Sequence, residues 1–469
     1  MVTPDAVLSD LWCGVGLAPD ALGRVRLIGR DPVLPSSFMI GTAAVAAIGA
    51  VGLAAAEIHR RRTGRDQSVS VDMRHAVAEF RSEALLRVDG APMGEAWDPV
   101  AGAYRTGDNG WVRIHTNFPH HRDGFLLLLG ADHTRESVAR AIAGWEAARL
   151  EDAAAAAGLP AAMMRTVEEW DAHPQGRAVA GLPVIEITRI GDAPPEPLPP
   201  ASSEPGADRP LAGLRALELT RIIAGPVCGR ALAAHGADAM LVTGPHLPAI
   251  PVLVVDTGRG KRSASLDLRE EAGREGLRGL VRGADLFIQG YRPGALASHG
   301  FGPAELAALR PGIVCVSLSA YGRAGPWSGR RGFDSLVQTA SGFNDAEARA
   351  AATPGEPRPL PCQALDHAAG YLMALGAMAA LMRRAEEGGS WLVQVSLART
   401  GLWLRGLGRV EEGFALPRPG EEPALMERTE TAFGLVSAVR HAALLSGTPA
   451  GWARPAAQLG THAPRWEEA

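Results

Sequence analysis

Lysine is almost missing from this 469-residue chain: 47 residues are lysine or arginine, and Lys261 is the only lysine. We interpret the bias as genomic base composition, although it draws attention to the place of the one lysine. Cysteine is also scarce, and no CxxC pair occurs, so the spacing typical of metal ligands is absent. We therefore expect no metal site, and we expect reduced, mostly buried thiols in a cytoplasmic protein. The cysteines are Cys13, Cys228, Cys315 and Cys362.

A strong net charge is lacking as well, since the formal charge is −4 and the pI is about 6.4. Nothing therefore draws the whole protein to nucleic acid or to an anionic membrane. The N-terminus shows no basic region followed by an apolar core, so no signal peptide is predicted. The Ala- and Gly-rich segment Ile40–Ile58 approaches the length of a membrane span, but we interpret it as a buried core helix. Hydrophobic residues make up 46% of the chain, which is typical of a globular protein.

A proline-rich stretch, 193–210, divides the chain and predicts an extended linker. After it, short apolar runs such as Leu214–Thr220 alternate with helical stretches such as Val227–Ala234. This alternation predicts an α/β fold with a parallel sheet. No GxGxxG follows the first strand, so the dinucleotide-binding fingerprint is missing. Before the linker, "VAGAYRTGDNGWVRIHT" predicts a hairpin in a small α+β unit over about 97–184.

An internal repeat relates Ser9–Met73 to Phe333–Leu397. Both copies begin with an Asp and a small-residue turn, continue into an Ala-rich helix with a basic cluster, and end in a strand. The place of Asp366 falls at 40–42 in the first copy, and the stretch Pro32–Ala56 contains no carboxylate. The helix can therefore be built without Asp366, so packing does not explain this acid.

Six segments between Pro210 and Ser396 follow one another in order: "PLAGLRALELTRIIAGP", "GRGKRSASLDL", "GYRPGAL", "VSLSAYGRAGPW", "GFDSLVQTASG" and "ALDHAAGYLMALGAMAALMRR". Together they resemble the class III CoA-transferases, the group of formyl-CoA and carnitine CoA-transferases. The first half resembles the rest of a family member, through "TGRDQSVSVDM", the hairpin and "TVEEWDAHPQGRA". The chain is thus similar to a rearranged and partly degenerate member, with the family's C-terminal part placed before its N-terminal part.

The resemblance implies a Rossmann-like parallel sheet in a large domain plus a smaller α+β domain, in the family's interlocked architecture. It implies a homodimer whose active site lies between the large domain of one chain and the small domain of the other. The second half lacks a unit comparable to the small one. We expect five regions: 1–75, a degenerate repeat of the Asp-helix region; 76–192, the small α+β domain; 193–210, the linker; 211–410, the CoA-binding domain with the catalytic Asp; and 411–469, a closing segment.

The resemblance also explains Asp366, which matches the family's catalytic aspartate. The family's carboxylate attacks an acyl-CoA thioester, and the reaction passes through a mixed anhydride and an aspartyl-CoA thioester before CoA reaches the acceptor acid. The alternative for Asp366 is a helix N-cap, a common place for Asp. His367 is expected to pack rather than to react. The implied substrates are an acyl-CoA and a small carboxylic acid, with coenzyme A as substrate and no bound cofactor.

Matches to the family's CoA-contact segments give the binding residues, since phosphates call for basic groups and backbone amides. Some positions depart from the family: Ile223 replaces a Gln that helps to position the thioester, Thr243-Gly244 replaces a Glu and a following residue, and Gly290 takes the place of an Asn. The predicted CoA-binding residues are Gly258, Arg259, Gly260, Lys261, Arg262, Gly290, Tyr291, Arg292, Tyr321, Ile223 and Ala224.

Two alternatives to a CoA-transferase stay open at this point. One is a relative that binds CoA or a partner without turnover, which the changes at Ile223 and Thr243 favour. The other is an acyl-CoA racemase or isomerase, which needs two acid–base groups at the α-carbon. The racemase branch has a histidine before the Asp of the "FDSLVQ" segment, where this chain has Phe333, so this activity is disfavoured. The donor acid, the acceptor acid and the chain that supplies the cover of Asp366 cannot be deduced from the sequence.

Overall fold

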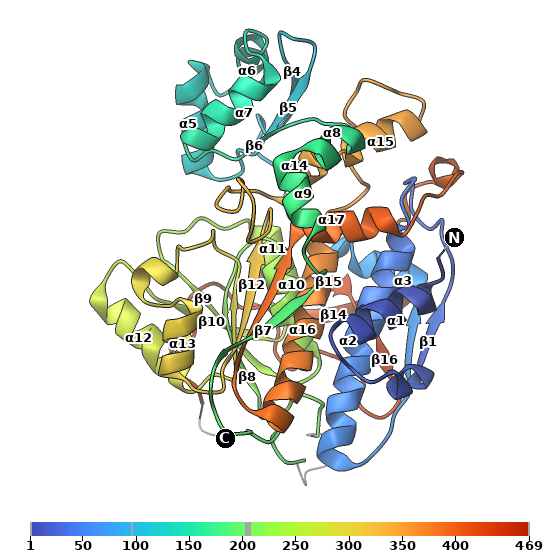
Figure 1. The fold of residues 1–469 in the computed structure, drawn as a ribbon, viewed down its shortest axis with the longest axis vertical. Helices are drawn as coiled ribbons and strands as arrows, with labels where there is room; N and C mark the ends of the chain where they lie inside the picture. Colours follow the sequence, from blue (N-terminus) through green and yellow to red (C-terminus); the bar gives the residue numbers. More distant parts are fainter. Residues whose placement is uncertain (1, 95–96, 202–207, 468–469) are drawn as a thin grey trace.

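The second half of the chain builds a seven-stranded sheet, in the order β10-β9-β8-β11-β12-β13-β7 (Figure 1). The computed structural model describes residues 2–94, 97–201 and 208–467. All neighbouring strands run parallel except β13 and β7, so the predicted parallel α/β sheet is confirmed with one antiparallel edge. The strands are β7 (Glu186–Gly191), β8 (Arg215–Leu219), β9 (Asp238–Thr243), β10 (Lys261–Ser265), β11 (Leu286–Gln289), β12 (Val314–Ser319) and β13 (Ser390–Ser396). The edge strand β7 comes from within 76–192.

Alternate residues along each strand face the two sides of this sheet, because side chains of a strand alternate. Leu217 and Phe287 pack with α12 (Glu271–Arg282) and α13 (Pro303–Leu309), while Ala216 and Ile288 face α10 (Ala224–Ala234) and α16 (Ala364–Glu387). The helices α10 and α16 lie close together. A Cβ at Gly370 would come within 2.6 Å of the Ala224 carbonyl oxygen. Small residues are therefore required at this crossing.

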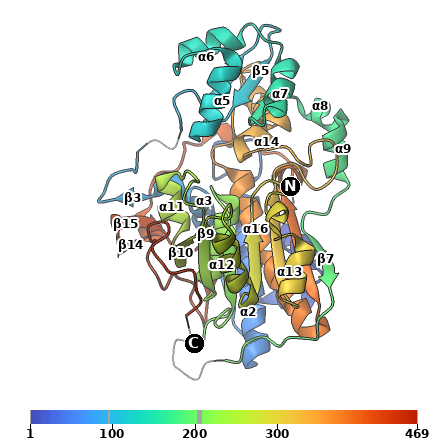
Figure 2. The same cartoon turned by 90° about the vertical axis from the view of Figure 1, so that its left-hand side faces the viewer.

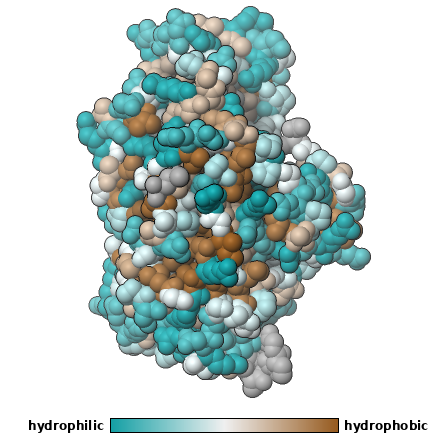
Figure 3. Space-filling model, turned by 90° about the vertical axis from the view of Figure 1, so that its right-hand side faces the viewer, coloured by the Kyte–Doolittle hydropathy of each residue, from teal (hydrophilic) through white to brown (hydrophobic). Residues whose placement is uncertain are grey.

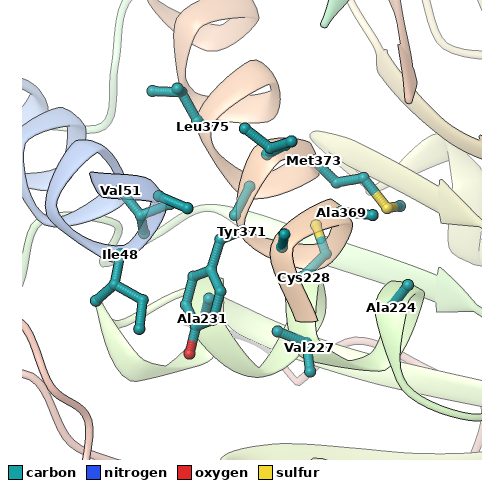
Figure 4. Close-up of a cluster of buried hydrophobic side chains, with 14 of the residues drawn as sticks. Ile48, Val51, Ala224, Val227, Cys228, Ala231, Ala369, Tyr371, Met373 and Leu375 are labelled. Carbon is teal, nitrogen blue, oxygen red and sulfur yellow. The ribbon is translucent and has the colours of Figure 1, made fainter. Parts of the chain in front are cut away.

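A second long helix, α2 (Ile40–Thr63), packs beside α16 on the side away from the sheet (Figure 1). Ile48 and Val51 of α2 and Tyr371 and Leu375 of α16 belong to one apolar cluster with α10 (Figure 4). Both α2 and α16 are long and apolar enough to cross a membrane, yet the whole apolar window of each is buried in the protein. The predicted buried core helix is thus confirmed. Beyond α2 lies a small sheet of β1 (Val25–Ile28), β2 (Val69–Asp72) and β16 (Leu444–Leu445).

The two segments of the predicted repeat contain the same succession of elements. The helices α2 and α16 have 24 residues each, and a strand and a second helix follow both. Gly52 of α2 would clash with Val69 of β2 if it carried a Cβ, and Gly376 of α16 would clash with Val393 of β13. Each copy opens with a helix, α1 (Pro4–Gly14) or α14 (Asp334–Ala340), and the expected small-residue turn follows that helix at residues 15–16 and 341–342. The second helices are α3 (Met73–Glu79) and α17 (Leu397–Gly406).

The small α+β unit stands at one end of the molecule (Figure 1, top). The predicted hairpin is confirmed, since β4 (Gly102–Arg105) pairs antiparallel with β5 (Trp111–Ile114). The unit has its own apolar core, which includes Val112, Phe125 and Leu150. Its other elements are α5 (Pro119–Leu129), α6 (Arg135–Ile142), α7 (Ala147–Ala156) and β6 (Ala161–Met163), and α8 (Val167–Ala172) and α9 (Pro174–Ala180) lead back to the large sheet.

The closing segment packs against the part of the chain that precedes the linker. Its strands β14 (Met426–Thr431) and β15 (Gly434–Val439) form a sheet with β3 (Arg87–Val88), at one edge of the molecule (Figure 2). Part of the predicted linker, 202–207, lies outside the described residues. Its remaining parts are held to α2, because the Arg62 guanidinium donates hydrogen bonds to the carbonyl oxygens of Pro199 (2.7 Å) and Pro210 (2.9 Å). The remaining helices are α4 (Ser82–Leu85), α11 (Pro251–Thr257) and α15 (Phe343–Ala350).

Candidate active site

A cavity opens at the carboxyl ends of β8, β11 and β12. On one side of β8 in the sheet lie β9 and then β10, which follow it in the sequence. On the other side lie β11, β12 and β13, which come next in the sequence. The order therefore reverses between β8 and β11, which is where parallel α/β sheets bind ligands. Residues 221–224 after β8, 290–293 after β11 and 318–320 at the end of β12 line the cavity, and Asp366 reaches it from the first turn of α16.

Asp366 is not a helix cap. The carboxylate of Asp334 accepts the hydrogen bond from the Asp366 backbone N–H (2.8 Å), so Asp334 satisfies this amide. The N-cap residue of α16 is Gln363. Among the residues that the structure describes, none donates a hydrogen bond to the Asp366 carboxylate, although this residue is only 6% exposed. A buried carboxylate without a donor is unusual, and here it borders a cavity.

The environment of this acid disfavours its ionised form. Burial raises the pKa of Asp366 well above its usual range, and the negative charges of Asp334 and Glu83 raise it further. Burial also raises the pKa of Asp334 to about 6. Two adjacent buried carboxyl groups cannot both ionise at low cost, so ionisation of one carboxyl group disfavours ionisation of the other. Such perturbed carboxyl groups in a cavity are typical of functional sites.

The small unit of the same chain forms the opposite wall of the cavity, through Phe118, His120 and His121. The cover of Asp366 is therefore supplied in cis. His121 is 3% exposed, and neither of its ring nitrogens has a hydrogen-bond partner among the described residues. Burial, followed by nearby positive charges, lowers the pKa of His121 to about 3, so its ring is neutral. The His115 ring stacks on Phe333 at 3.7 Å between centroids.

Four arginines also line the cavity, against the single carboxylic acid of Asp366. Arg330 forms an ion pair with Asp152 at 3.0 Å. For Arg221, Arg292 and Arg331, no carboxylate partner lies within ion-pair distance anywhere in the described chain. The cavity is thus lined by unpaired positive charge and suits an anionic ligand.

The sequence model of CoA-transferase family III matches residues 22–204 and 211–461, which is most of the chain. The chain belongs to CoA-transferase family III. This establishes the family that the sequence motifs indicate, and it makes the protein a member of a family of CoA-transferring enzymes.

Among the relatives of this family III protein, an acyl-CoA transferase of Gibberella moniliformis is 30% identical over 80% of this chain and 72% of its own length. Succinyl-CoA--D-citramalate CoA-transferase of Chloroflexus aurantiacus is 31% identical over 40% of this chain and 49% of its own length. The solved structure of Rv3272 from Mycobacterium tuberculosis aligns with a TM-score of 0.39 at 30% identity, over 42% of this chain and 57% of that chain. The chain thus spans about three quarters of the first relative's length and about half of the other two.

The structure brings five of the eleven predicted CoA-binding residues of this family III protein to the cavity with Asp366: Ile223, Ala224, Gly290, Tyr291 and Arg292. These residues lie in the loops after β8 and β11. Their neighbour Ile222 has a φ of +76°, which is costly for a β-branched residue. Backbone strain of this kind is concentrated at functional sites.

The other six predicted residues lie elsewhere. The Lys261 ammonium is buried 2.7 Å from the Glu218 carboxylate and donates to the Pro226 carbonyl oxygen at 2.7 Å. Arg259 pairs with Asp256, Arg262 pairs with Asp238, and Gly258 and Gly260 lie in the same turn before β10. Tyr321 is 2% exposed and packs against Trp327. None of the six lines the cavity that contains Asp366.

His367 is fully buried, with its Nε2 2.9 Å from the Glu83 carboxylate, and it packs on Phe80, as the sequence predicts for a packing residue. Sequence reasoning missed the roles of Asp334, His121, Arg221 and Arg331 in the site. The Asp334 signal was present, because "FDSLVQ" is a family segment, but its contact with α16 spans 32 residues. His121 and Arg331 have no local pattern that would mark them.

Proposed function

We propose that this protein transfers coenzyme A from an acyl-CoA donor to a carboxylic acid acceptor, with Asp366 as the nucleophile. The observation that carries the proposal is the Asp366 carboxylate itself. It lies at the start of a 24-residue helix, it borders a cavity, and no described residue donates a hydrogen bond to it. Family membership supports the same reaction class.

The first half of the reaction converts the donor. An Asp366 carboxylate oxygen attacks the thioester carbonyl carbon, the carbon–sulfur bond breaks, and CoA leaves as a thiolate. The product is a mixed anhydride between Asp366 and the acyl group. The thiolate then attacks the aspartyl carbonyl carbon, which releases the donor acid as a carboxylate and leaves an aspartyl-CoA thioester.

The second half repeats these steps in reverse with the acceptor. The acceptor carboxylate attacks the aspartyl thioester, and the thiolate leaves and then attacks the acyl carbon of the new anhydride. This yields the acceptor thioester and restores the Asp366 carboxylate without net consumption of water or protons. The helix dipole of α16 favours the ionised carboxylate.

The CoA body is proposed to run from the cavity along the loop after β11. Tyr291 lines both the cavity with Asp366 and a neighbouring cavity bordered by Thr243, Gly244 and His246. Because Tyr291 borders both cavities, this observation supports the prediction that Gly290–Arg292 contacts CoA. The thioester would then lie beside Ile223, whose side chain offers no hydrogen bond to it.

Assembly as a homodimer, including any interlocking of two chains, is part of the proposal, as is a cytoplasmic location. Apolar side chains gather on the face of the molecule where α1 and β1 lie (Figure 3), and Ile28 of β1 is 37% exposed. Because the cover of Asp366 comes from the same chain, a dimer would not have to complete the site. The free thiols support a reducing compartment. A monomer at all concentrations in sedimentation experiments would contradict the dimer.

The test is to trap the covalent enzyme. The purified protein is incubated with several short acyl-CoAs, denatured, digested and analysed by mass spectrometry, with and without hydroxylamine. We expect a hydroxylamine-sensitive adduct on the peptide that contains Asp366 and none in Asp366→Asn. An adduct elsewhere, or transfer by Asp366→Asn at the wild-type rate, would overturn the proposal.

One observation favours a second candidate, a protein that binds CoA without turnover. The basic residues predicted to hold CoA just before β10 and at its start form internal ion pairs, so fewer cations remain for the phosphates. This candidate predicts a CoA-dependent rise in melting temperature without an adduct.

A further inference from the structure

Two arginines beside the nucleophile have charges that the described protein does not neutralise. The Arg221 guanidinium stacks over Phe118 at 4.2 Å and donates one hydrogen bond to the Pro248 carbonyl oxygen at 2.5 Å. The Arg331 Nε is buried and has no hydrogen-bond partner among the described residues. Burial lowers the pKa of both groups, and each lies close enough to His121 to lower its pKa further. A buried guanidinium is costly without a counter-ion.

A comparison with Arg330 shows that the lack of a carboxylate partner at Arg221 and Arg331 is not common to all arginines of the cavity. Arg330 lies next to Arg331 in the chain and lines the same cavity, but Asp152 neutralises it at 3.0 Å. Arg331 and Arg221 instead line the same cavity without a carboxylate partner in the described chain, and the charge of Arg331 contributes to the lowered pKa of Arg221. Two guanidinium groups that repel each other across a cavity form a site for an anion that bridges them.

We propose that Arg221 and Arg331 bind the distal carboxylate of the acyl group, so that the substrates are short dicarboxylic acids and their CoA thioesters. This inference rests on the proposed function and specifies its substrate class. The planar guanidinium forms two parallel hydrogen bonds with a carboxylate, which gives geometric selectivity as well as charge neutralisation. The cavity of about 150 Å³ suits a short acyl group, because an apolar cavity of this size accommodates benzene.

The position of the pair favours the acyl end of the substrate over the CoA end. Arg331 is three residues before Asp334, which holds the first turn of α16, and Arg221 contacts Phe118 of the covering unit. Both arginines are therefore on the walls that enclose Asp366. Arg292, in contrast, also borders a second cavity, which is lined by residues of β12 and β13. The same anion chemistry could come from CoA phosphates, so the experiment separates the two sources.

The experiment compares succinyl-CoA with butyryl-CoA, which have the same chain length and differ in the terminal carboxylate. For the wild type we expect kcat/KM to favour succinyl-CoA by roughly 100-fold. In Arg331→Met and Arg221→Met we expect a loss of roughly 10- to 100-fold for succinyl-CoA and less than about 3-fold for butyryl-CoA. Arg323→Met, which removes an exposed charge paired with Glu186, serves as the control for a general effect of lost charge.

If the arginines bind CoA phosphates, both donors lose kcat/KM equally in the two variants, and the inference is wrong. A wild type that prefers butyryl-CoA also overturns it. A binding measurement keeps the inference testable if transfer itself is absent. Calorimetric titration of Asp366→Asn with succinate and with butyrate should detect binding of succinate only, and Arg331→Met should abolish it in the double variant. Equal binding of the two acids, or of neither, contradicts the inference without bearing on the chemistry of Asp366.

Discussion

The helices α2 and α16 have 24 residues each, and a buried carboxylate caps the first turn of both, yet only α16 carries the proposed nucleophile. In the first copy the Asp31 carboxylate accepts hydrogen bonds from the backbone N–H groups of Gly41 (3.1 Å) and Thr42 (2.7 Å). In the second copy the Asp334 carboxylate accepts the equivalent bond from the Asp366 N–H. Thr42 and Asp366 occupy the same place, 324 residues apart.

This comparison separates folding from function within one molecule. A buried carboxylate from an earlier part of the chain satisfies the first turn of each helix, so the fold needs Asp31 and Asp334. It does not need an acid on the helix, since Thr42 completes α2 without one. Thr42 is 1% exposed and lines none of the described cavities, whereas Asp366 borders one. The acid at 366 is therefore consistent with the chemistry that we propose at that cavity.

Substitution of the two equivalent residues should give the largest difference. Asp366→Asn keeps the shape of the side chain but removes the nucleophile, so CoA transfer should fall by about 10³-fold or more. Thr42→Val should leave the rate of transfer within about 3-fold of the wild type, because nothing at this position faces the cavity. The measurement is initial-rate transfer at saturating acyl-CoA, with circular dichroism as a check of folding. A comparable fall in both variants would show that the copies are not functionally distinct.

Substitution of the equivalent glycines of α2 and α16 should destabilise the protein to a similar degree, because each glycine allows its helix to pack closely on a neighbouring strand. A Cβ on Gly376 would lie 2.5 Å from a methyl carbon of Val393, and a Cβ on Gly52 would lie 2.9 Å from a methyl carbon of Val69. Gly376→Ala and Gly52→Ala should each lower the free energy of unfolding by about 1–3 kcal/mol, as overpacking does. Urea denaturation measures this. If only Gly376→Ala destabilises the protein, the shared frame of the repeat is weaker in the first copy.

The two capping carboxylates should differ in their effect on the pH dependence of activity. Asp334→Asn removes a negative charge that raises the pKa of Asp366, so the acid limb of the pH–rate profile should move to lower pH. Asp31→Asn should leave this limb in place. Both changes should cost about 0.5–2 kcal/mol of stability, the usual cost of a lost helix cap. An unmoved acid limb in Asp334→Asn would mean that Asp334 supports the helix only.

Much of the frame could be predicted because its signals are local. The strand–helix alternation after residue 210, the hairpin near Gly102 and the repeat follow from periodicity, turn residues and internal similarity. Asp366 was found by its place in a family segment. The small-residue turns expected at the start of each copy are present at 15–16 and 341–342, where α1 and α14 end.

The electrostatics of the site could not be predicted, because they depend on long-range contacts. Lys261 stands in a CoA-contact motif, yet its partner Glu218 lies 43 residues away and neutralises it in the core. Arg331 is part of a basic pair in the sequence, and only the fold shows that Arg330 is neutralised while Arg331 faces the cavity. Whether a charge is paired within the protein or free for a ligand depends on residues that no local window contains.

The smallest expected effect is on stability, and it has the opposite sign to the effect on activity. The folded state retains the proton of Asp366 to a higher pH than the unfolded chain, whose Asp residues titrate near pH 3.9. Stability contributed by this group is therefore full at low pH and declines as pH rises toward the folded-state pKa.

Asn cannot ionise, so Asp366→Asn should melt at a higher temperature than the wild type at pH 8, and the difference should shrink at pH 4. Thr42→Val, with no titrating group replaced, should show the same change in melting temperature at both pH values. If Asp366→Asn is equally or less stable than the wild type at pH 8, burial of this acid does not lower the stability of the protein. The energetic argument that Asp366 is present for function, while Thr42 is not, would then be lost.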